Sequence, residues 1–332
     1  MTQETIKELK KILRFPESTE GKNLIRKILH LKLPPDMLDL VKKYELAGGK
    51  RNIYLWKWCW YTQNAGFILS CVSPEYFEII SKIRLALTIF ITALDDIADI
   101  YRDRKFIDEL VKIPFYLEEI NYGKMDKKQK IYTKFIAELW KKIDNLLQKL
   151  PRYDEFRDML LCDLRQSYDS LYYSYLVNTY PSIINLEEVK ARESSNMIWY
   201  VYSDAELMAS PSFDIKELGL LREIISYSQQ MVRLGNWLGT WKREIKERDF
   251  SSAVVAYGLN SNIITVEDLL TQDSDYLIKK LENSNAQECL LREWMLNYKK
   301  IEKLAPLVKS VDIIAYLKGL KNLLKLQLIC SA

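Results

Sequence analysis

The chain has 332 residues, which is enough for one large domain or two ordinary ones. Hydrophobic residues make up 48% and charged residues 28%, as in an ordinary soluble globular protein. The net charge of +4 comes from scattered Lys and Arg residues, which argues against nucleic acid as a partner.

Cysteine and histidine usage excludes several kinds of site. The five cysteines are odd in number, far apart and without a CxxC pair, so we expect reduced thiols and a cytoplasmic protein. His30 is the only histidine, which excludes a histidine-rich metal site and leaves a Ser-His-Asp or Cys-His mechanism only this one residue. The first residues lack the apolar centre of a signal peptide, and no apolar run approaches the 18 or so residues of a membrane span.

Helical periodicity dominates the chain, with prolines between the periodic segments and only 10 glycines in total. Gly48 and Gly49 are expected to form a left-handed helix cap. The predicted helices span residues 3–14, 18–32, 37–46, 54–69, 74–99, 125–149, 152–180, 186–209, 214–248, 265–281, 286–303 and 308–328. No linker or repeat divides them, so the sequence predicts one all-α domain over residues 1–332, with residues 1–35 as peripheral N-terminal helices.

Three acids end the apolar run of residues 85–94. Asp95 and Asp99 are one helical turn apart and share a face, while Asp96 is rotated by about 100°. Carboxylates at the end of an apolar helix are costly to bury without a partner, and oxygen ligands at this spacing suit Mg²⁺. A helix end whose acids simply face water is the alternative.

A second polar face follows on the helix predicted for residues 214–248. Asn236, Thr240 and Glu244 have the spacing i, i+4, i+8, so one face presents an amide oxygen, a hydroxyl and a carboxylate. This is an oxygen-only set for a hard divalent ion, with Arg243 beside it for an anion. The alternative is the polar stripe of an amphipathic helix. Two such faces together would hold Mg²⁺ ions around a diphosphate.

These residues carry a resemblance to a known family. The segment Asp95–Asp99 (DDIAD) resembles the aspartate-rich DDxxD motif of class I terpene synthases, and Asn236–Glu244 (NWLGTWKRE) resembles their NDxxSxxxE triad. The order, the separation and the helical background over about residues 45–330 also match. The resemblance implies a helical bundle around a central apolar cavity that binds a prenyl diphosphate with three Mg²⁺ ions.

The resemblance also assigns roles to single residues. Asp95 and Asp99 would bind Mg²⁺ with Asp96 in support, and Asn236, Thr240 and Glu244 would hold a further ion. Asp95, Asp99, Arg192, Asn236 and Glu244 are the expected catalytic set. Arg192 matches the diphosphate-sensing arginine, and Ser195 and Asn196 would then lie at a helix break facing the nascent cation. The expected diphosphate-binding residues are Arg192, Arg243, Arg233, Lys50 and Arg51.

Two departures from the family pattern stand out. Trp237 occupies the position where the triad usually has Asp. The last third of the chain also lacks the Arg-Tyr pair of many bacterial members, so another basic residue such as Lys299 or Lys300 would have to supply that diphosphate contact.

The segment Gly48–Arg51 (GGKR) resembles one that binds diphosphate in trans-prenyl diphosphate synthases, although a helix cap followed by two surface cations has the same sequence. Some bacterial diterpene synthases keep a similar segment, which favours geranylgeranyl diphosphate over farnesyl diphosphate. A bicyclic C20 diphosphate is a further candidate.

The resulting expectation is a Mg²⁺-dependent terpene cyclase. The alternative enzyme is a chain-elongating trans-prenyl diphosphate synthase, which would carry a second aspartate-rich motif where this chain has Asn236 and Thr240. A non-catalytic helical scaffold is the alternative of another class. Homodimers are common in the family resembled, so a second copy of the chain is a candidate partner.

Overall fold

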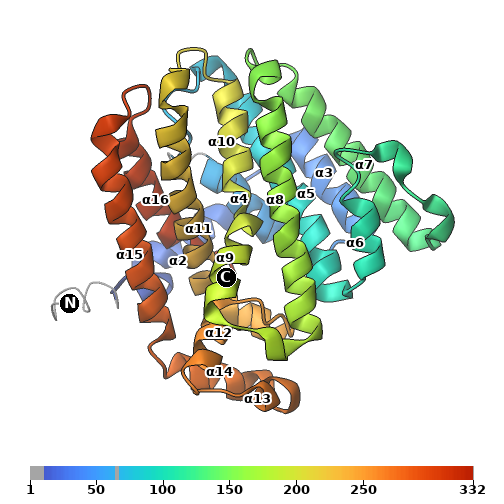
Figure 1. Cartoon of the computed structure of the whole chain (residues 1–332), viewed down its shortest axis with the longest axis vertical. Coiled ribbons are helices and arrows are strands. Elements are labelled where there is room, and N and C mark those ends of the chain that lie inside the picture. The colour runs from blue at the N-terminus through green and yellow to red at the C-terminus, as the bar shows by residue number, and fades with distance from the viewer. Residues whose placement is uncertain (1–10, 64–66, 332) are drawn as a thin grey trace.

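The computed structural model describes residues 11–63 and 67–331, and every regular element in them is helical (Figure 1). This confirms the all-α prediction. The α-helices are α2 Thr19–Leu29, α3 Pro35–Ala47, α4 Ile53–Gln63, α5 Phe77–Asp96, α6 Arg104–Leu110, α7 Lys127–Leu147, α8 Tyr153–Thr179, α9 Leu186–Glu193, α10 Trp199–Met208, α11 Leu218–Lys246, α12 Ala253–Asn260, α13 Val266–Thr271, α14 Ser274–Glu282, α15 Ala286–Leu304 and α16 Ile313–Gln327.

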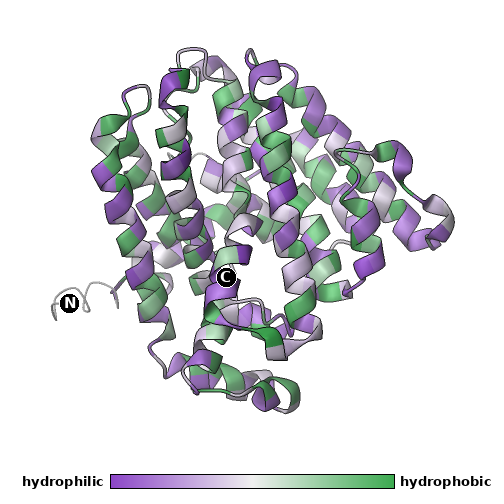
Figure 2. Ribbon diagram, viewed as in Figure 1, coloured by the Kyte–Doolittle hydropathy of each residue, from purple (hydrophilic) through white to green (hydrophobic). Residues whose placement is uncertain are grey.

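The long helices run side by side and enclose one large apolar core, while α12, α13 and α14 lie across one end of the bundle (Figure 1). Helix α11 is central and packs against α10, α15 and α16. Polar and apolar residues are interleaved along the long helices, as expected when each helix buries one face (Figure 2). None of the helices in the described residues is long and apolar enough to cross a membrane.

Several helix ends follow from local chemistry. Ser18 Oγ accepts a hydrogen bond of 3.0 Å from Gly21 N at the start of α2, and Asp126 forms a capping box with Gln129 at the start of α7. Helix α3 ends at Gly48, whose φ of 109° requires glycine, so the predicted left-handed cap is confirmed.

Some predicted helices have other boundaries. The described part of the segment 54–69 is helical only to Gln63, and residues 67–72 form no helix. Residues 265–281 form two short helices, α13 and α14, because Asp273 starts a new helix with its own cap. The short helices α6 and α12 were not predicted, and most of the expected helix 3–14 lies outside the described residues.

The N-terminal part of the chain lies beside α4 and the C-terminal end. Phe15 and Ile28 belong to a small apolar cluster with Tyr54, Leu326 and Ile329, separate from the main core. Residues 1–10 of the predicted peripheral segment lie outside the described residues.

Regular helix is interrupted at two places, and both involve residues that the sequence singled out as candidate site residues. Helix α5 continues into a single π-helical turn, Ile97–Tyr101, which closes at Arg102 with φ of 52°. The predicted helix 186–209 is broken at residues 194–198 and resumes as α10 after Ile198, a β-branched residue with φ of 45°. Positive φ is unfavourable for such a residue, and π turns and strained positions are concentrated at functional sites.

Glycines allow α16 to approach α11 closely. A Cβ atom added to Gly239 would lie 1.9 Å from the carbonyl oxygen of Gln327, and one added to Gly235 would lie 2.0 Å from the Gln327 side chain. Gln327 Nε2 in turn donates to Val232 O at 2.7 Å. The helix that carries Asn236, Thr240 and Glu244 is therefore held from behind by a backbone contact that only glycine permits.

Replacing Gly239 with alanine is expected to destabilise the protein by ~3 kcal/mol, because backbone atoms of Gln327 would have to move. Gly219→Ala is the matched control, since Gly219 is exposed in the same helix and an added Cβ meets no atom within 4 Å. Urea unfolding should show the control unchanged or slightly stabilised. Equal effects of the two substitutions would contradict the role of the close helix contact.

Candidate active site

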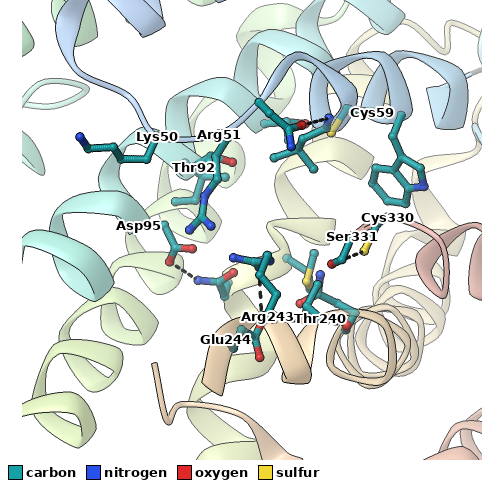
Figure 3. A pocket seen from close by; sticks show the side chains of 18 of the residues that line it. Lys50, Arg51, Cys59, Thr92, Asp95, Thr240, Arg243, Glu244, Cys330 and Ser331 are labelled. Atoms are coloured by element: carbon teal, nitrogen blue, oxygen red, sulfur yellow. Dashed lines mark hydrogen bonds and ion pairs between the residues drawn. The ribbon is translucent and has the colours of Figure 1, made fainter. Parts of the chain in front are cut away.

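One cavity of about 250 Å³ opens between the two polar faces identified in the sequence. Its walls come from residues 50–52, α4, α5, the break at residues 194–198, α10, α11 and the C-terminal residues. Asp95 and Arg51 lie on one side of the opening, and Thr240, Arg243 and Glu244 lie on the other (Figure 3). Of the candidate ligands, Asp95, Asn236, Thr240 and Glu244 line this cavity although they are far apart in the sequence, whereas Asp96 and Asp99 are outside its lining.

Asp95 and Asp99, on the α5 side, differ in their exposure to the cavity and in their hydrogen bonds. Asp95 lines the cavity, where its Oδ1 accepts a hydrogen bond of 2.8 Å from Asn196 Nδ2 at the helix break. Asp99 lies in the π turn, is only 7% exposed, and its Oδ1 has no hydrogen-bond partner. The break predicted near Ser195 and Asn196 is present, and it contacts the aspartate segment directly.

Asp96 faces away from the cavity and holds the segment 48–51. Its carboxylate accepts a hydrogen bond from the Tyr44 hydroxyl and pairs with Arg51 Nε at 3.1 Å. The Tyr44 oxygen accepts hydrogen bonds from the backbone N–H groups of Lys50 and Arg51. This buried network places the side chains of Lys50 and Arg51 at the wall of the cavity.

On the α11 wall, the predicted triad lies on one face and lines the cavity. Thr240 Oγ1 is 2.6 Å from Glu244 Oε1 and 2.8 Å from the carbonyl oxygen of Asn236. Glu244 is 5% exposed, and its Oε2 has no hydrogen-bond partner. Trp237, where the family has Asp, points into the core and is 1% exposed.

Arg233 links the triad to the helix break. Its guanidinium donates to Asn236 Oδ1 at 2.9 Å and to Glu193 Oε2 at 2.6 Å, and its Nε has no partner. Glu193 is fully buried and also accepts a hydrogen bond from Ser174. Arg233 lines the cavity and can therefore meet an anion there.

A glutamate joins the two arginines at the mouth. Glu247 Oε2 lies 3.1 Å from Arg51 Nη1 and 2.5 Å from Arg243 Nη1, so one carboxylate bridges cations from opposite walls. All three side chains line the cavity, together with Lys50. A doubly bridging carboxylate occupies the place that a larger anion would take between these cations.

Arg192 does not line the cavity. Its guanidinium is half exposed, pairs with Glu188 at 2.8 Å and lies over the ring of Tyr173. The diphosphate-sensing role predicted for Arg192 stays a prediction. Lys299 and Lys300, the suggested substitutes for the Arg-Tyr pair, also lie outside the cavity lining.

Burial and mutual repulsion raise the pKa of the acids in this site. Desolvation, followed by the Asp249 carboxylate, raises the pKa of Glu244 to about 7. Desolvation raises the pKa of Glu193 to about 8, although Arg233 opposes the shift. The pKa of Asp99 lies well above its usual range because it is desolvated and close to Asp249 and Asp95.

The donor set fits Mg²⁺ in chemistry, although it is not preassembled. Within residues 11–63 and 67–331, no three Asp, Glu, His or Cys side chains converge on one point as a ready metal site. Asp99 Oδ1 and Glu244 Oε2 are nonetheless buried carboxylate oxygens without a hydrogen-bond partner. Such oxygens are costly unless a proton or a cation compensates them, and hard oxygen ligands are the ones that Mg²⁺ prefers.

Sequence reasoning missed Glu193, Glu247 and Asp249. Asp249 is 6% exposed, accepts a hydrogen bond of 2.9 Å from Asn178, and raises the pKa of the acids on both walls. Glu247 follows Arg243 by one helical turn, a spacing that could have indicated their ion pair. Glu193 and Asp249 gave no such signal, because their partners are distant in the sequence.

Comparison with known proteins identifies the fold. No family model matches the sequence, and no curated protein is similar to it in sequence. Isoprene synthase from grey poplar leaves (Populus x canescens) is similar in structure, with a TM-score of 0.54 and 16% identity, over 92% of this chain and 54% of that one. Its complex with three Mg²⁺ ions and dimethylallyl-S-thiolodiphosphate gives a TM-score of 0.53 and 15% identity, over 96% of this chain and 59% of that one.

The chain therefore spans little more than half the length of these solved structures. It is a single all-α helical domain that resembles the class I terpene synthase fold, as the sequence predicted. At this level of identity the likeness establishes the fold alone.

The raised pKa values predict that the metal-free protein becomes less stable as pH rises. Between the usual glutamate pKa of about 4.3 and the folded values of about 7 and 8, the folded state retains protons that the unfolded chain has lost. In EDTA, the Tm should fall by ~5 °C between pH 5 and pH 8. Glu244→Gln should show a smaller fall, and Mg²⁺ at pH 8 should raise the Tm of the unsubstituted protein only. A Tm that rises between pH 5 and pH 8 in EDTA would contradict the raised pKa values of Glu193 and Glu244.

Proposed function

We propose that the protein is a Mg²⁺-dependent terpene synthase that ionises an allylic prenyl diphosphate and cyclises the resulting carbocation. The observation that carries this proposal is a pair of unpartnered buried carboxylate oxygens. Glu244 Oε2 belongs to a residue that lines a cavity with four cationic side chains, and Asp99 Oδ1 lies one helical turn after Asp95, which lines the same cavity. Divalent ions would compensate the charge of the carboxylates, and a diphosphate bound to those ions would pair with the cationic side chains.

The metal-binding residues under this proposal are those of the two walls. Asp95 and Asp99 would hold ions on the α5 side with Asp96 in support, while Asn236, Thr240 and Glu244 would hold one on the α11 side. The grey poplar enzyme binds three Mg²⁺ ions, and we propose the same number here. Bound Mg²⁺ supplies electrostatic stabilisation for the diphosphate leaving group.

The chain's own cations bind the diphosphate. Arg233, Arg243, Lys50 and Arg51 line the same cavity and can donate hydrogen bonds to its oxygens. Glu247 now bridges Arg51 and Arg243, so substrate binding would replace one carboxylate by a more highly charged anion. The arginines then draw the two walls together around the diphosphate and separate the reacting carbons from bulk solvent.

The deeper part of the cavity would hold the hydrocarbon. Ile91, Met197, Ile198 and the rings of Tyr54 and Trp58 line it. Apolar walls fold the chain without trapping the carbocation, and ring faces stabilise positive charge. The C1–O bond breaks with both electrons leaving on the diphosphate, which can later take the proton that the carbocation loses.

Geranylgeranyl diphosphate is the favoured substrate, because the segment Gly48–Arg51 resembles one kept in some diterpene synthases. Farnesyl diphosphate and a bicyclic C20 diphosphate remain candidates. The cavity volume of about 250 Å³ is just below the usual range of about 300–1,000 Å³ for ligand pockets. We propose that the Arg51–Glu247–Arg243 contact opens when a C20 chain binds.

Chain elongation is the alternative reaction, and the same segment supports it. Asn236 and Thr240 disfavour it, since an elongase would have aspartates on this wall. Incubation with C5 to C20 diphosphates, followed by gas chromatography–mass spectrometry, separates the two reactions. A product that forms only when isopentenyl diphosphate is added would establish elongation. A scaffold would release no diphosphate from any of these substrates.

Asp95→Ala and Glu244→Ala should each lower Mg²⁺-dependent diphosphate release by at least ~100-fold, because each removes one proposed metal ligand. Their far-UV circular dichroism should match that of the unsubstituted protein. Asp158→Ala is the control, since Asp158 has a side chain that is 98% exposed on α8 and lies outside the cavity lining. Full activity of either cavity variant would refute the metal assignment.

A further inference from the structure

The floor of the cavity carries two hydroxyl groups that the proposed ionisation does not use. Thr88 on α5 and Tyr202 on α10 both line the cavity, with their oxygens 2.7 Å apart. Thr88 shares a helix face with Ile91, Thr92 and Asp95, all of which line the cavity. Asp95 follows Thr88 by seven positions, so the hydroxyl pair lies about 10 Å from the aspartate along the helix axis, toward the start of α5.

The direction of the hydrogen bonds at this pair can be assigned. Thr88 Oγ1 donates its only proton to the carbonyl oxygen of Arg84 at 2.7 Å. The hydrogen bond between the two hydroxyls must therefore run from Tyr202 to Thr88. With its proton engaged, the Tyr202 oxygen can act in the cavity only as an acceptor.

Arg84 fixes this arrangement from below. Its guanidinium is buried, lies 4.5 Å from the ring centroid of Tyr202, and also packs on the rings of Phe67 and Trp199. An ion pair with Glu206 neutralises the charge of Arg84. The phenol ring is thus held on one face by a cation while its oxygen is turned to the cavity side, bonded to Thr88.

A hydrocarbon can give no hydrogen bond to such an acceptor, whereas a water molecule can. An acceptor left without a donor in an apolar cavity costs free energy, and a cavity of about 250 Å³ has room for a water, whose share of liquid volume is about 30 Å³. A water that donates one hydrogen to Tyr202 Oη keeps a lone pair free for an electron-deficient carbon.

We propose that Tyr202, positioned by Thr88 and Arg84, holds a water molecule that quenches the carbocation, so that the protein forms a terpene alcohol. This inference rests on the proposed function. The water oxygen forms a C–O bond with the carbocation, and the proton that it then loses passes to the released diphosphate. Substrate and water thus yield alcohol and hydrogen diphosphate, with no oxidant or reductant required.

The depth of the pair determines which carbon is hydroxylated. Carbon C1 is ionised near Asp95, and the water at Tyr202 lies about two helical turns deeper. The hydroxyl group is therefore added to a carbon remote from C1 after the chain has folded. Simple hydrolysis of the substrate, in contrast, leaves the hydroxyl on or next to C1.

The test is incubation with prenyl diphosphates in H₂¹⁸O, with diphosphate release measured beside the mass spectra of the products. The inference predicts an alcohol with ¹⁸O on a carbon remote from C1. Tyr202→Phe should lower the alcohol share of the products about tenfold, as expected for the loss of one hydrogen bond, while diphosphate release continues and hydrocarbon products increase.

Thr88 is tested by a conservative pair of variants. Thr88→Val frees the Tyr202 proton and should also lower the alcohol share, whereas Thr88→Ser keeps the hydroxyl and should restore it. Tyr200→Phe is the matched control on the same helix. The Tyr200 hydroxyl donates to Arg222 O at 3.1 Å, and this side chain is not part of the cavity lining, so the product mixture should not change. Thermal unfolding checks that each variant folds.

The outcomes separate the two proposals. Diphosphate release with hydrocarbon products only, or an alcohol share that Tyr202→Phe leaves unchanged, would overturn the water site while leaving the terpene synthase function standing. Absence of release from every prenyl diphosphate would overturn the proposed function, and the water site with it.

Discussion

The structure depends on the burial of several carboxylates around one cavity. Glu193 and Glu244 are each at most 5% exposed, and repulsion from neighbouring acids adds to the desolvation that raises their pKa values. Three arginines lower the free-energy cost of burying these carboxylates. Arg233 pairs with Glu193, Arg51 pairs with Asp96, and Arg243 pairs with Glu247. The compensation is incomplete, and the oxygens left without a partner belong to residues that the sequence singled out as metal ligands.

Three local features of the helices position these charged side chains. The π turn carries Asp99, the strained break before Ile198 places Asn196 against Asp95, and glycines on α11 let α16 pack closely behind the helix that carries the triad. Each feature costs conformational free energy that the surrounding core must offset. Together they place Asp95 on one wall and Asn236, Thr240 and Glu244 on the other wall of a single cavity.

The sequence predicted the fold class and the two walls, because helical periodicity and the i, i+4 spacing of Asn236 and Thr240 are local signals. It could not predict how the charges pair. Asp96 was expected beside the metal ions, yet it binds Tyr44 and Arg51, and the difference depends on packing between α3 and α5. Arg192 and Arg233 were both expected to meet the diphosphate, and only Arg233 lines the cavity, while Arg192 pairs with Glu188 one turn earlier in α9. The π turn has no sequence signature that could have shown it.

Binding of inorganic diphosphate tests whether the two walls form one site for a diphosphate with its metal ions, without any assumption about the hydrocarbon. Isothermal titration calorimetry should show saturable binding in the presence of Mg²⁺ and none in EDTA. Asp99→Asn on one wall and Glu244→Gln on the other should each abolish that binding. Tight binding that persists in EDTA, or in both variants, would contradict the account.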